Sequence, residues 1–460
     1  MEHVVTKQKK HDFLKHFSVH IIITTVLASL FFTLIYFFDN KFTRESPQAK
    51  DGLLTVDTET IDDTKIFYLT DGWAIYQDQL LTPQNINAYT PTQYINIGDH
   101  HTMSFGDENY PEHGYTTYRM MIDVSNDYGD NVYTLQLPAI YSAYHLYING
   151  DLMLTVGTPE AEKYEPQIYS TEITFSARNQ IDIVIAVADW TNYESGIVSP
   201  LAFGRSSNVN NMISTRMIVQ AILIGTSLML GIVLNGLRSH LHKRPAILML
   251  CLIFCIIGLN LFSVVSAIRP VGIFWFYFDT FCFYAIFFVG IWLNSDLCHI
   301  HNWFAICIKV IDATLCVLSV AIPLFHSGDH SPIHIFHEFA HIYKYFLLVY
   351  LTVSCILSLK ESPYYATHVL YGLAVFAVVA VFNMVVPKMS NILLSDPLRM
   401  GCFIVIYILG FSMAHDSVYK HRRDMVWARD HYENIINDDL LSIAENLTAP
   451  FVYPEHHSER

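Results

Sequence analysis

The hydrophobic positions of this 460-residue chain are concentrated in eight apolar stretches, one near the N-terminus and seven in the second half. They are Phe17 to Phe38, Met212 to Gly236, Ala246 to Ala267, Gly272 to Leu293, Trp303 to Phe325, His341 to Leu359, Tyr365 to Val386, and Met400 to Ala414. At about 1.5 Å per residue, most can cross the ~30 Å hydrocarbon core of a membrane as helices. The last is short, but Asp396 and Pro397 before it are typical of an N-cap and a first helical residue, which extends it. The pattern predicts a helical membrane protein with eight spans, an anchor at 17–38 and a seven-span domain at 212–414.

Between the first and second spans, apolar and polar residues alternate instead. Tyr118, Met120 and Ile122 would point to one side of a strand, with Arg119 and Met121 on the other. The same alternation recurs over 133–137, 144–148 and 181–187, and turn residues separate the runs at 126–131 and 149–151. Many short strands with no helical period predict an all-β antiparallel sandwich at 45–208.

Lysine and arginine give the orientation, because they are retained on the cytoplasmic side. The clusters are Lys7, Lys9, Lys10 and Lys15, then Arg238, Lys243 and Arg244, then Lys420, Arg422, Arg423 and Arg429. An even number of spans places all three on one side. We therefore expect a multi-pass protein of the cell (inner) membrane, with residues 40–210 extracytoplasmic and both the 1–16 N-terminus and the 415–460 segment cytoplasmic. A cleaved signal peptide is the alternative, but no small-residue cleavage site follows Phe38.

Composition separates the same two parts. Hydrophobic residues make up 52% of the chain and charged residues only 15%, which is low for a soluble protein. Between Glu45 and Arg205 there are 23 acidic and 6 basic residues, a net charge of −17 against −15 for the whole chain. This acidity argues against nucleic acid as a partner of the outer domain. All eight cysteines lie between Cys251 and Cys402, so the outer domain is free of disulfides.

Three segments of the outer domain carry a resemblance. They are His113 to Arg119, Leu137 to Gly150 with its Tyr-Ile-Asn-Gly turn, and Ile183 to Trp190. In this order they resemble the galactose-binding-like jelly roll, which occurs as the sugar-binding module of large glycosidases. With Asp71-Gly72-Trp73 upstream, the domain is more similar to that of bacterial seven-transmembrane receptors with diverse intracellular signalling modules. The resemblance implies an outer domain that binds carbohydrate or another small ligand, and membrane helices that pass the signal inward.

The C-terminal end departs from that family, since only 46 residues follow Ala414. This is too short for a kinase, cyclase or phosphatase domain. Val418, Met425 and Tyr432 recur every seven residues, and apolar positions continue to Leu447. We expect a helix that continues the last span and contacts a separate cytoplasmic signalling protein through residues 416–448. Either it pairs with a second copy as a homodimeric coiled coil, or it is a single amphipathic helix that lies on membrane lipid or folds back on the bundle.

One motif has a second interpretation, because His337-Glu338-Phe339-Ala340-His341 matches the H-E-x-x-H zinc signature. His330 and His334 extend the same helical face. The chain holds 23 histidines, and no downstream pattern offers a third protease ligand. We therefore interpret the cluster as an incidental His-rich region, with a metal or pH-sensing site and a metalloprotease as the alternatives.

Ionisable residues within the spans form a further group of candidates. Asp279 lies in the fourth span, and Lys309 and Asp312 lie three apart in the fifth. Charges in hydrocarbon are costly, so we expect internal pairs or satisfied polar contacts rather than an ion path. The sequence contains no Gly-rich phosphate loop, no Ser/His/Asp elbow and no cysteine pair at zinc spacing, so we expect neither an enzyme nor a cofactor.

Ligand recognition in the outer domain needs a flat aromatic face and a few fixed polar groups. Residues of this chemistry near expected strand ends are Trp73, Tyr115, Arg119, Asn149, Asp189, Trp190 and Tyr193. Ordinary core aromatics, a turn asparagine and a surface arginine would account for each of them singly. Together they predict a site for a small molecule on strand-end loops. The sequence thus favours a sensory receptor over a metalloprotease or a non-signalling binding or adhesion protein.

Overall fold

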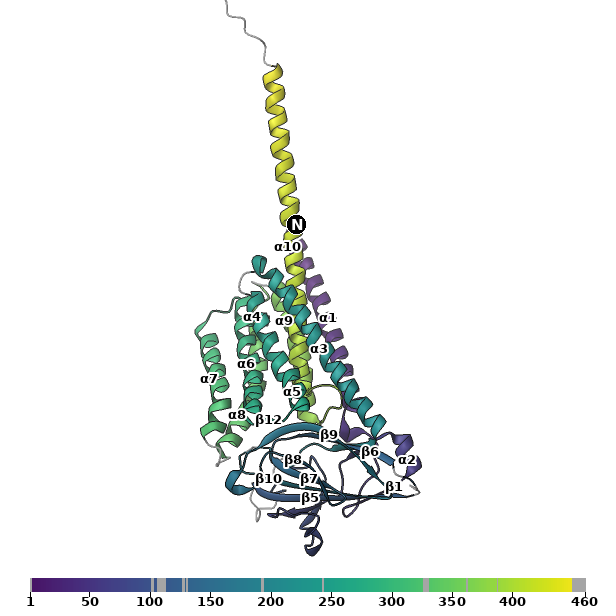
Figure 1. Cartoon of the computed structure of the whole chain (residues 1–460). Coiled ribbons are helices and arrows are strands. Elements are labelled where there is room, and N and C mark those ends of the chain that lie inside the picture. Colours follow the sequence, from purple (N-terminus) through teal and green to yellow (C-terminus); the bar gives the residue numbers. More distant parts are fainter. Residues whose placement is uncertain are drawn as a thin grey trace, which may run out of the picture.

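The computed structural model of the chain describes residues 2–100, 103–105, 113–125, 129, 131–191, 194–241, 244–325, 331–360, 363–386 and 388–448. A β domain and a helical bundle are stacked end to end, and one helix extends far beyond the bundle on the side away from the β domain (Figure 1). The chain is therefore a helical membrane protein with a β domain at one end.

Two mainly antiparallel sheets form the β domain. The first has the order β4-β3-β5-β10-β7-β8, with β1 parallel to β5, and the second has the order β12-β9-β6-β11-β2. Their bounds are Leu53–Asp57 (β1), Ile66–Leu69 (β2), Trp73–Gln77 (β3), Gln93–Ile95 (β4), Gly114–Ser125 (β5), Asn131–Ile140 (β6), Ala143–Ile148 (β7), Asp151–Val156 (β8), Gln167–Ala177 (β9), Gln180–Asp189 (β10), Leu201–Arg205 (β11) and Val271–Gly272 (β12). The short helix η1 (Lys41–Thr43) precedes β1, and further short helices lie between the strands at Thr58–Thr64 (α2), Ile86–Ala88 (η2) and Ala161–Lys163 (η3).

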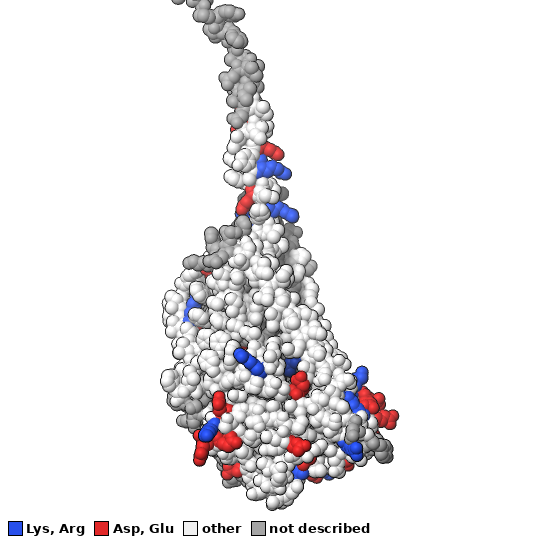
Figure 2. Space-filling model, in the orientation of Figure 1, with Lys and Arg blue, Asp and Glu red and all other residues white. Residues whose placement is uncertain are grey.

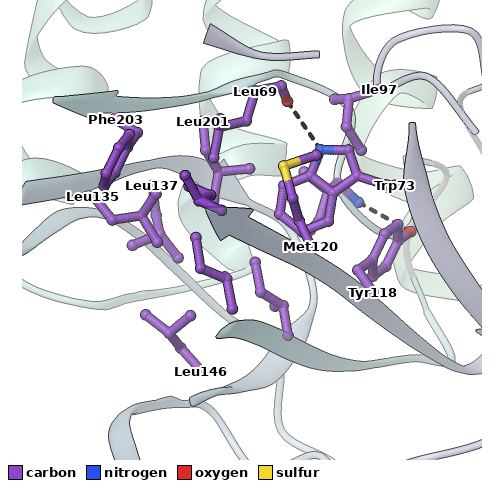
Figure 3. Close-up of a cluster of buried hydrophobic side chains, with 14 of the residues drawn as sticks. Leu69, Trp73, Ile97, Tyr118, Met120, Leu135, Leu137, Leu146, Leu201 and Phe203 are labelled. Carbon is purple, nitrogen blue, oxygen red and sulfur yellow. Dashed lines mark hydrogen bonds between the residues drawn. The ribbon is translucent and has the colours of Figure 1, made fainter. Parts of the chain in front are cut away.

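The predicted alternation is confirmed on β5. Tyr118, Met120, Ile122 and Val124 are at most 1% exposed and form part of the core between the sheets, whereas Arg119, Met121 and Asp123 are half-buried. Leu135 and Phe203 from the second sheet pack in the same core (Figure 3). The expected turn at 149–151 also forms, because Asn149 and Gly150 adopt φ angles of 52° and 93° and join β7 to β8. The 126–131 turn lies largely outside the described residues.

The helices of the bundle agree with most expected spans. Their bounds are Glu2–Phe38 (α1), Ser206–Leu241 (α3), Arg244–Ile256 (α4), Ile257–Leu261 (the π-helical η4), Phe262–Ile268 (α5), Phe274–Leu297 (α6), Trp303–Phe325 (α7), Ser331–Ser358 (α8), Pro363–Val385 (α9) and Pro397–Thr448 (α10). Within the described residues, seven of these helices are long and apolar enough to cross a membrane, and Arg244–Ile256 is a shorter apolar helix. The sixth expected span begins earlier than His341, at Ser331. Figure 2 shows that the surface of the bundle carries few charged side chains compared with the β domain below it, as membrane-crossing helices require.

The start of α10 follows the expected capping chemistry. The Asp396 carboxylate accepts hydrogen bonds from the backbone N–H groups of Leu398 (2.8 Å) and Arg399 (3.3 Å), and Pro397 is the first helical residue. From there α10 runs for 52 residues without interruption. Beyond the bundle it projects away rather than folding back (Figure 1), which removes the fold-back alternative for this segment.

The β domain and the bundle are joined by the chain itself, by strand pairing and by side-chain packing. Strand β11 ends at Arg205 and α3 begins at Ser206, so no loop separates them. Strand β12, which follows α5, adds to the edge of β9 with Val271 opposite Ile168. The Tyr141 ring packs against Phe276 of α6 with ring centroids 4.7 Å apart. These links place the second sheet over one end of the helical bundle.

Candidate functional site

The structure divides the residues expected to bind a ligand into separate groups. Trp73 is fully buried in the sandwich core, where its indole Nε1 donates to the Leu69 carbonyl at 3.0 Å (Figure 3). Its burial follows from its position as the first residue of β3, where it faces the core rather than a loop. It presents no stacking surface in this structure. Tyr193 lies outside the described residues.

Tyr115, Asp189 and Trp190 do meet at one end of the first sheet, where β5 begins and β10 ends. The rings of Tyr115 and Trp190 lie edge to face, 5.4 Å apart, and Trp190 is 38% exposed. Asp189 is fully buried, and its carboxylate accepts hydrogen bonds from the Ser142 hydroxyl (2.6 Å) and the Thr191 backbone N–H (3.0 Å). Trp190 is therefore available to a ligand, whereas the Asp189 carboxylate is held by the protein.

Arg119 and Asn149 lie at a different place, around Asp182 of β10. The Arg119 guanidinium binds both carboxylate oxygens of Asp182, at 2.9 and 3.0 Å, and this contact raises the pKa of the arginine. Asn149 accepts a hydrogen bond from the Asp182 backbone N–H at 2.8 Å. Arg119 also donates to Asn87. Both side chains thus stabilise the sheet, and the expected set does not converge on one site.

A cavity lies between the β domain and the adjacent ends of the bundle helices. It has a volume of about 560 Å³, within the usual range for small-ligand sites. The β domain contributes Tyr141, Ser170 and Glu194, while the bundle contributes residues of α3, α5, α6, α8 and α10. Charged, hydroxyl and aromatic groups share the lining, so this cavity offers both orienting polar contacts and apolar area.

An ion pair among the residues that line the cavity links α6 to α10. Arg399 donates to both carboxylate oxygens of Asp279, at 2.8 and 2.5 Å, and also to the carbonyl oxygen of Gly258 in the π-helical segment. Asp279 is 3% exposed. The structure thus confirms the expectation of an internal pair for Asp279, which lies in the first two turns of α6. Bidentate arginine–carboxylate contacts are strong and directional, so the ends of three helical elements are fixed to one another here.

The residues that follow the anchor helix clamp the segment that leads into α10. The Asp39 carboxylate accepts from the backbone N–H groups of Leu393 (2.8 Å) and Leu394 (3.0 Å). Asn40 pairs with Asn391, and its side chain accepts from the Ser390 N–H at 3.0 Å. Burial raises the pKa of Asp39, which these backbone contacts oppose. Residues 39–41 therefore position the 388–396 segment, whose last residue caps α10.

Lys41 connects this clamp to the β domain. Its Nζ donates to the Pro200 carbonyl of the β10–β11 loop at 3.2 Å, and the side chain is only 3% exposed. Burial and, to a lesser extent, the positive charge of Arg216 on α3 together lower the pKa of this amine to about 7. Both Lys41 and Arg216 line the cavity. The region thus holds two neighbouring cationic side chains, of which Lys41 is buried and Arg216 is half-buried.

The His-rich region contributes one residue to the same cavity. His337 lines it, whereas Glu338 and His341 are exposed on α8. His330 lies outside the described residues, and the side chain of His334 is not described. Among the residues that the structure describes, no three His, Cys, Asp or Glu side chains gather as metal ligands. The described part of the chain thus gives no support to the metalloprotease alternative.

Asp312 lies deeper in the bundle and its contacts differ from those expected. It is 3% exposed, and its Oδ2 has no hydrogen-bond partner among the described residues. Lys309, three residues earlier, is half-buried and forms no ion pair with it within 4 Å. Asp312 instead lines a second cavity with Tyr343, Lys344 and His337. Of the two arrangements expected for Asp312, an ion pair with Lys309 is therefore not seen among the described residues.

Sequence reasoning missed Lys41, Arg216 and Arg399. Each is a cation at the edge of an apolar stretch, where the same residue usually marks a membrane boundary. Their convergence depends on tertiary contacts between segments that are far apart in sequence, such as residues 39–41 and 388–394. The polar sequence Asp39-Asn40-Lys41 directly after a span was the one local signal.

Comparisons with known proteins identify no relative for the whole chain. No family model and no curated protein matches it. Among solved structures, a GH2 β-galacturonidase from Eisenbergiella tayi is 6% identical, over 30% of this chain and 24% of that one, with a TM-score of 0.22. A β-glucuronidase from Bacteroides uniformis is 15% identical over 30% and 17% of the two chains, and one from Faecalibacterium prausnitzii is 10% identical over 30% and 31%, both with TM-scores of 0.22. This chain therefore spans less than a third of each of these proteins, and a likeness of this extent carries no argument about its function.

Proposed function

We propose that this protein is a sensory receptor of a bacterial cell membrane that binds a small ligand outside and relays its binding to a cytoplasmic partner. In this proposal the β domain is an extracytoplasmic jelly roll and the bundle crosses the membrane eight times. The helical elements α4, η4 and α5 have 13, 5 and 7 residues and follow one another directly. At about 1.5 Å per residue they are together long enough for the eighth span. The positive-inside rule supports cytoplasmic termini.

One observation carries the proposal: a single helix connects the cavity to the opposite end of the molecule. Asp396 and Arg399 line the cavity at the first turn of α10, and the same helix continues to Thr448 (Figure 1). A continuous helix transmits a tilt, rotation or shift along its length because its backbone hydrogen bonds resist local bending. A change at the cavity therefore has a direct mechanical route to the far side of the bundle.

The contacts around the cavity hold the start of α10 in one arrangement, and a ligand could change those contacts. The 388–396 segment is held by Asp39 and Asn40, and Arg399 is held by Asp279. A ligand that changes either set of contacts favours one arrangement of α10 over another. Reversing a two-state equilibrium from 1:99 to 99:1 takes about 5.5 kcal/mol of differential binding, which a few polar contacts in a desolvated site can provide.

The exposed end of α10 supports a cytoplasmic output. Met425, Trp427, Tyr432 and Ile436 are each more than half exposed there. Apolar side chains in this number on an isolated helix favour contact with another protein. We propose that residues 416–448 bind a signalling protein, either as one helix or as a homodimeric coiled coil.

Tryptic cleavage of α10 tests the relay. The extension carries Lys420, Arg422, Arg423 and Arg429 as cleavage sites beyond the cavity. The full chain in lipid nanodiscs is first screened against sugars, organic acids and amino acids by thermal shift. Any hit is then titrated while the cleavage rate at these sites is measured, and the rate should change over the concentration range that raises the melting temperature. A compound that stabilises the protein and leaves cleavage unchanged would identify a binding protein without this relay.

The matched control for that test is an exposed position on the same helix. Arg399→Gln removes the cavity contact with Asp279, whereas Arg429→Gln removes an equal charge from the exposed end, where Arg429 contacts only Asp430. The relay predicts that Arg399→Gln alters the ligand-dependent change in cleavage at Lys420 and Arg422, whereas Arg429→Gln leaves that change intact. Equal behaviour of the two variants would contradict the route through α10.

A further inference from the structure

We propose that Lys41 and Arg216 form a binding site for an anionic group, a carboxylate, sulfate or phosphate, at the junction of the β domain and the bundle. The proposal does not rest on the signalling role, since an anion would bind there whether or not the protein relays its presence. It assigns the charge of the ligand, which neither the sequence nor the cavity volume gives.

The first argument is that both cations lack an anionic partner. No carboxylate lies within 4 Å of Lys41 or Arg216 among the described residues. Lys41 donates to the Pro200 carbonyl at 3.2 Å, and Arg216 donates to the Ser263 hydroxyl at 3.4 Å. Burying a charge without a counter-charge is costly. Two adjacent cations that share this environment therefore form a place where an anion would be stabilised.

The second argument concerns the carboxylates nearby, most of which are engaged elsewhere. Asp39 accepts two backbone N–H groups, Asp396 caps α10, and Asp279 is held by Arg399. Glu172 of β9 lines a cavity with Lys41 and Arg216, but it is exposed and makes no ion pair with either. The charge of Asp39 acts on Arg216 through space, but none of these acids forms an ion pair within 4 Å with Lys41 or Arg216.

The third argument is geometric. Lys41 and Arg216 line both the 560 Å³ cavity and a neighbouring one of about 170 Å³, in which Gln220 and Ser263 also lie. Gln220 is 2% exposed, and its Oε1 has no hydrogen-bond partner among the described residues. An anionic group that also carries a hydroxyl would satisfy this oxygen while its charge contacts the two cations. The larger cavity then has room for the remainder of a small organic molecule.

The titration of Lys41 supports the same conclusion. Its pKa of about 7 means that the amine loses its proton readily when no anion is bound. An anion would raise this pKa, so binding above pH 7 takes up a proton and weakens as the pH rises. The other titratable or charged groups around Lys41 are Asp39, Tyr68 of β2, Tyr141, Glu172, Glu194, Arg216, Asp279, Tyr284, His337, Asp396 and Arg399.

Anion titration of the full chain in nanodiscs tests the site. Sulfate and acetate are the probes, because neither changes its charge between pH 7 and 9. In nanodiscs of zwitterionic phosphatidylcholine, either anion should raise the melting temperature at pH 7. The half-maximal concentration should rise by up to about tenfold per pH unit above pH 7. Lys41→Met and Arg216→Gln should each raise this concentration at least tenfold, and Lys41→Met should also abolish its pH dependence.

Two further arms complete the experiment. Lys163→Gln is the matched control, because Lys163 is exposed on η3 and its loss changes the net charge by the same amount. The parent is also moved into nanodiscs that contain phosphatidylglycerol without added anion. Stabilisation there that depends on Lys41 supports the site with a lipid headgroup as its source, whereas a response to sulfate or acetate supports a soluble source. If Lys41→Met, Arg216→Gln and Lys163→Gln all behave as the parent does in both lipids, the assignment is wrong. Arg216→Gln keeps the test decisive if Lys41→Met fails to fold.

Discussion

The buried amine of Lys41 gives the most quantitative prediction about this protein. The structure places the side chain at 3% exposure between the β domain and the bundle. Burial and the charge of Arg216 lower its pKa from an ordinary value near 10.5 to about 7. Each tenfold change in a proton equilibrium corresponds to about 1.4 kcal/mol, so folding with a protonated Lys41 costs on the order of 4 to 5 kcal/mol relative to folding with the neutral amine.

The sign follows from proton counting. Between pH 7 and 10.5 the unfolded chain holds a proton on Lys41 that the native chain has lost, so stability rises with pH across this window. Below pH 7 the amine is charged in both states, and the full penalty is present. Replacing the amine in Lys41→Met removes both the penalty and its pH dependence. It also removes the hydrogen bond to the Pro200 carbonyl, a loss of about 1 kcal/mol that is smaller than the gain.

We therefore expect Lys41→Met to be more stable than the parent at pH 7, and the advantage to shrink as the pH approaches 10. The measurement is the melting temperature of the full chain in phosphatidylcholine nanodiscs at pH 6.5, 7.5, 8.5 and 9.5 in a buffer free of multivalent anions. Lys163→Met serves as the control, because the exposed Lys163 should give no pH-dependent difference. A difference between Lys41→Met and the parent that stays constant from pH 7.5 to 9.5 would refute the reasoning, since Lys41 would then titrate outside this window.

Three other predictions follow from the structure. Asp279→Asn should lower the stability of the full chain by about 3 to 5 kcal/mol because it leaves Arg399 buried without its partner, and the double variant Asp279→Leu/Arg399→Leu should recover most of the loss; equal melting temperatures for the single and double variants would contradict this. Trp73→Ala should destabilise the β domain by about 3 to 5 kcal/mol, whereas Trp190→Ala, at a 38% exposed position, should leave its melting temperature within a few degrees of the parent; guanidinium titration of both variants distinguishes the two roles. Residues 45–208 expressed alone should fold as a monomeric β domain whose melting temperature is unchanged by reducing agent, and a mostly helical circular dichroism spectrum would overturn that expectation.

The sequence was sufficient to predict the elements whose burial follows a simple period. Strand β5 has its apolar residues on the core side because alternation specifies one face of a sheet. The N-cap at Asp396 was likewise readable, because capping depends on residues next to each other in the chain. These are local or periodic signals, and the structure follows them closely.

The location of the candidate site was not predictable in the same way. Trp73 and Trp190 look alike in sequence, since Trp73 begins β3 and Trp190 directly follows β10, yet one fills the core and the other is 38% exposed. Which of the two is buried depends on the packing of the second sheet, which one sequence does not specify. The pair of Asp279 with Arg399 joins residues 120 positions apart. No sequence feature near either residue indicates that the other is its partner.

In the proposed function, the placement of the cavity makes the ligand site and the relay depend on the same few residues. The cavity is lined by groups that also position the start of α10, namely Arg399 and residues of the 388–396 segment that Asp39 holds. In a site on the outer loops of the β domain, such as the one around Trp190, binding would have to alter the packing between the sheets before it reached the membrane. Tightly packed cores resist such small changes, whereas a polar junction can exchange one set of hydrogen bonds for another at little net cost. The junction is therefore the position at which a few kcal/mol of binding free energy acts most directly on the helix that leaves the membrane.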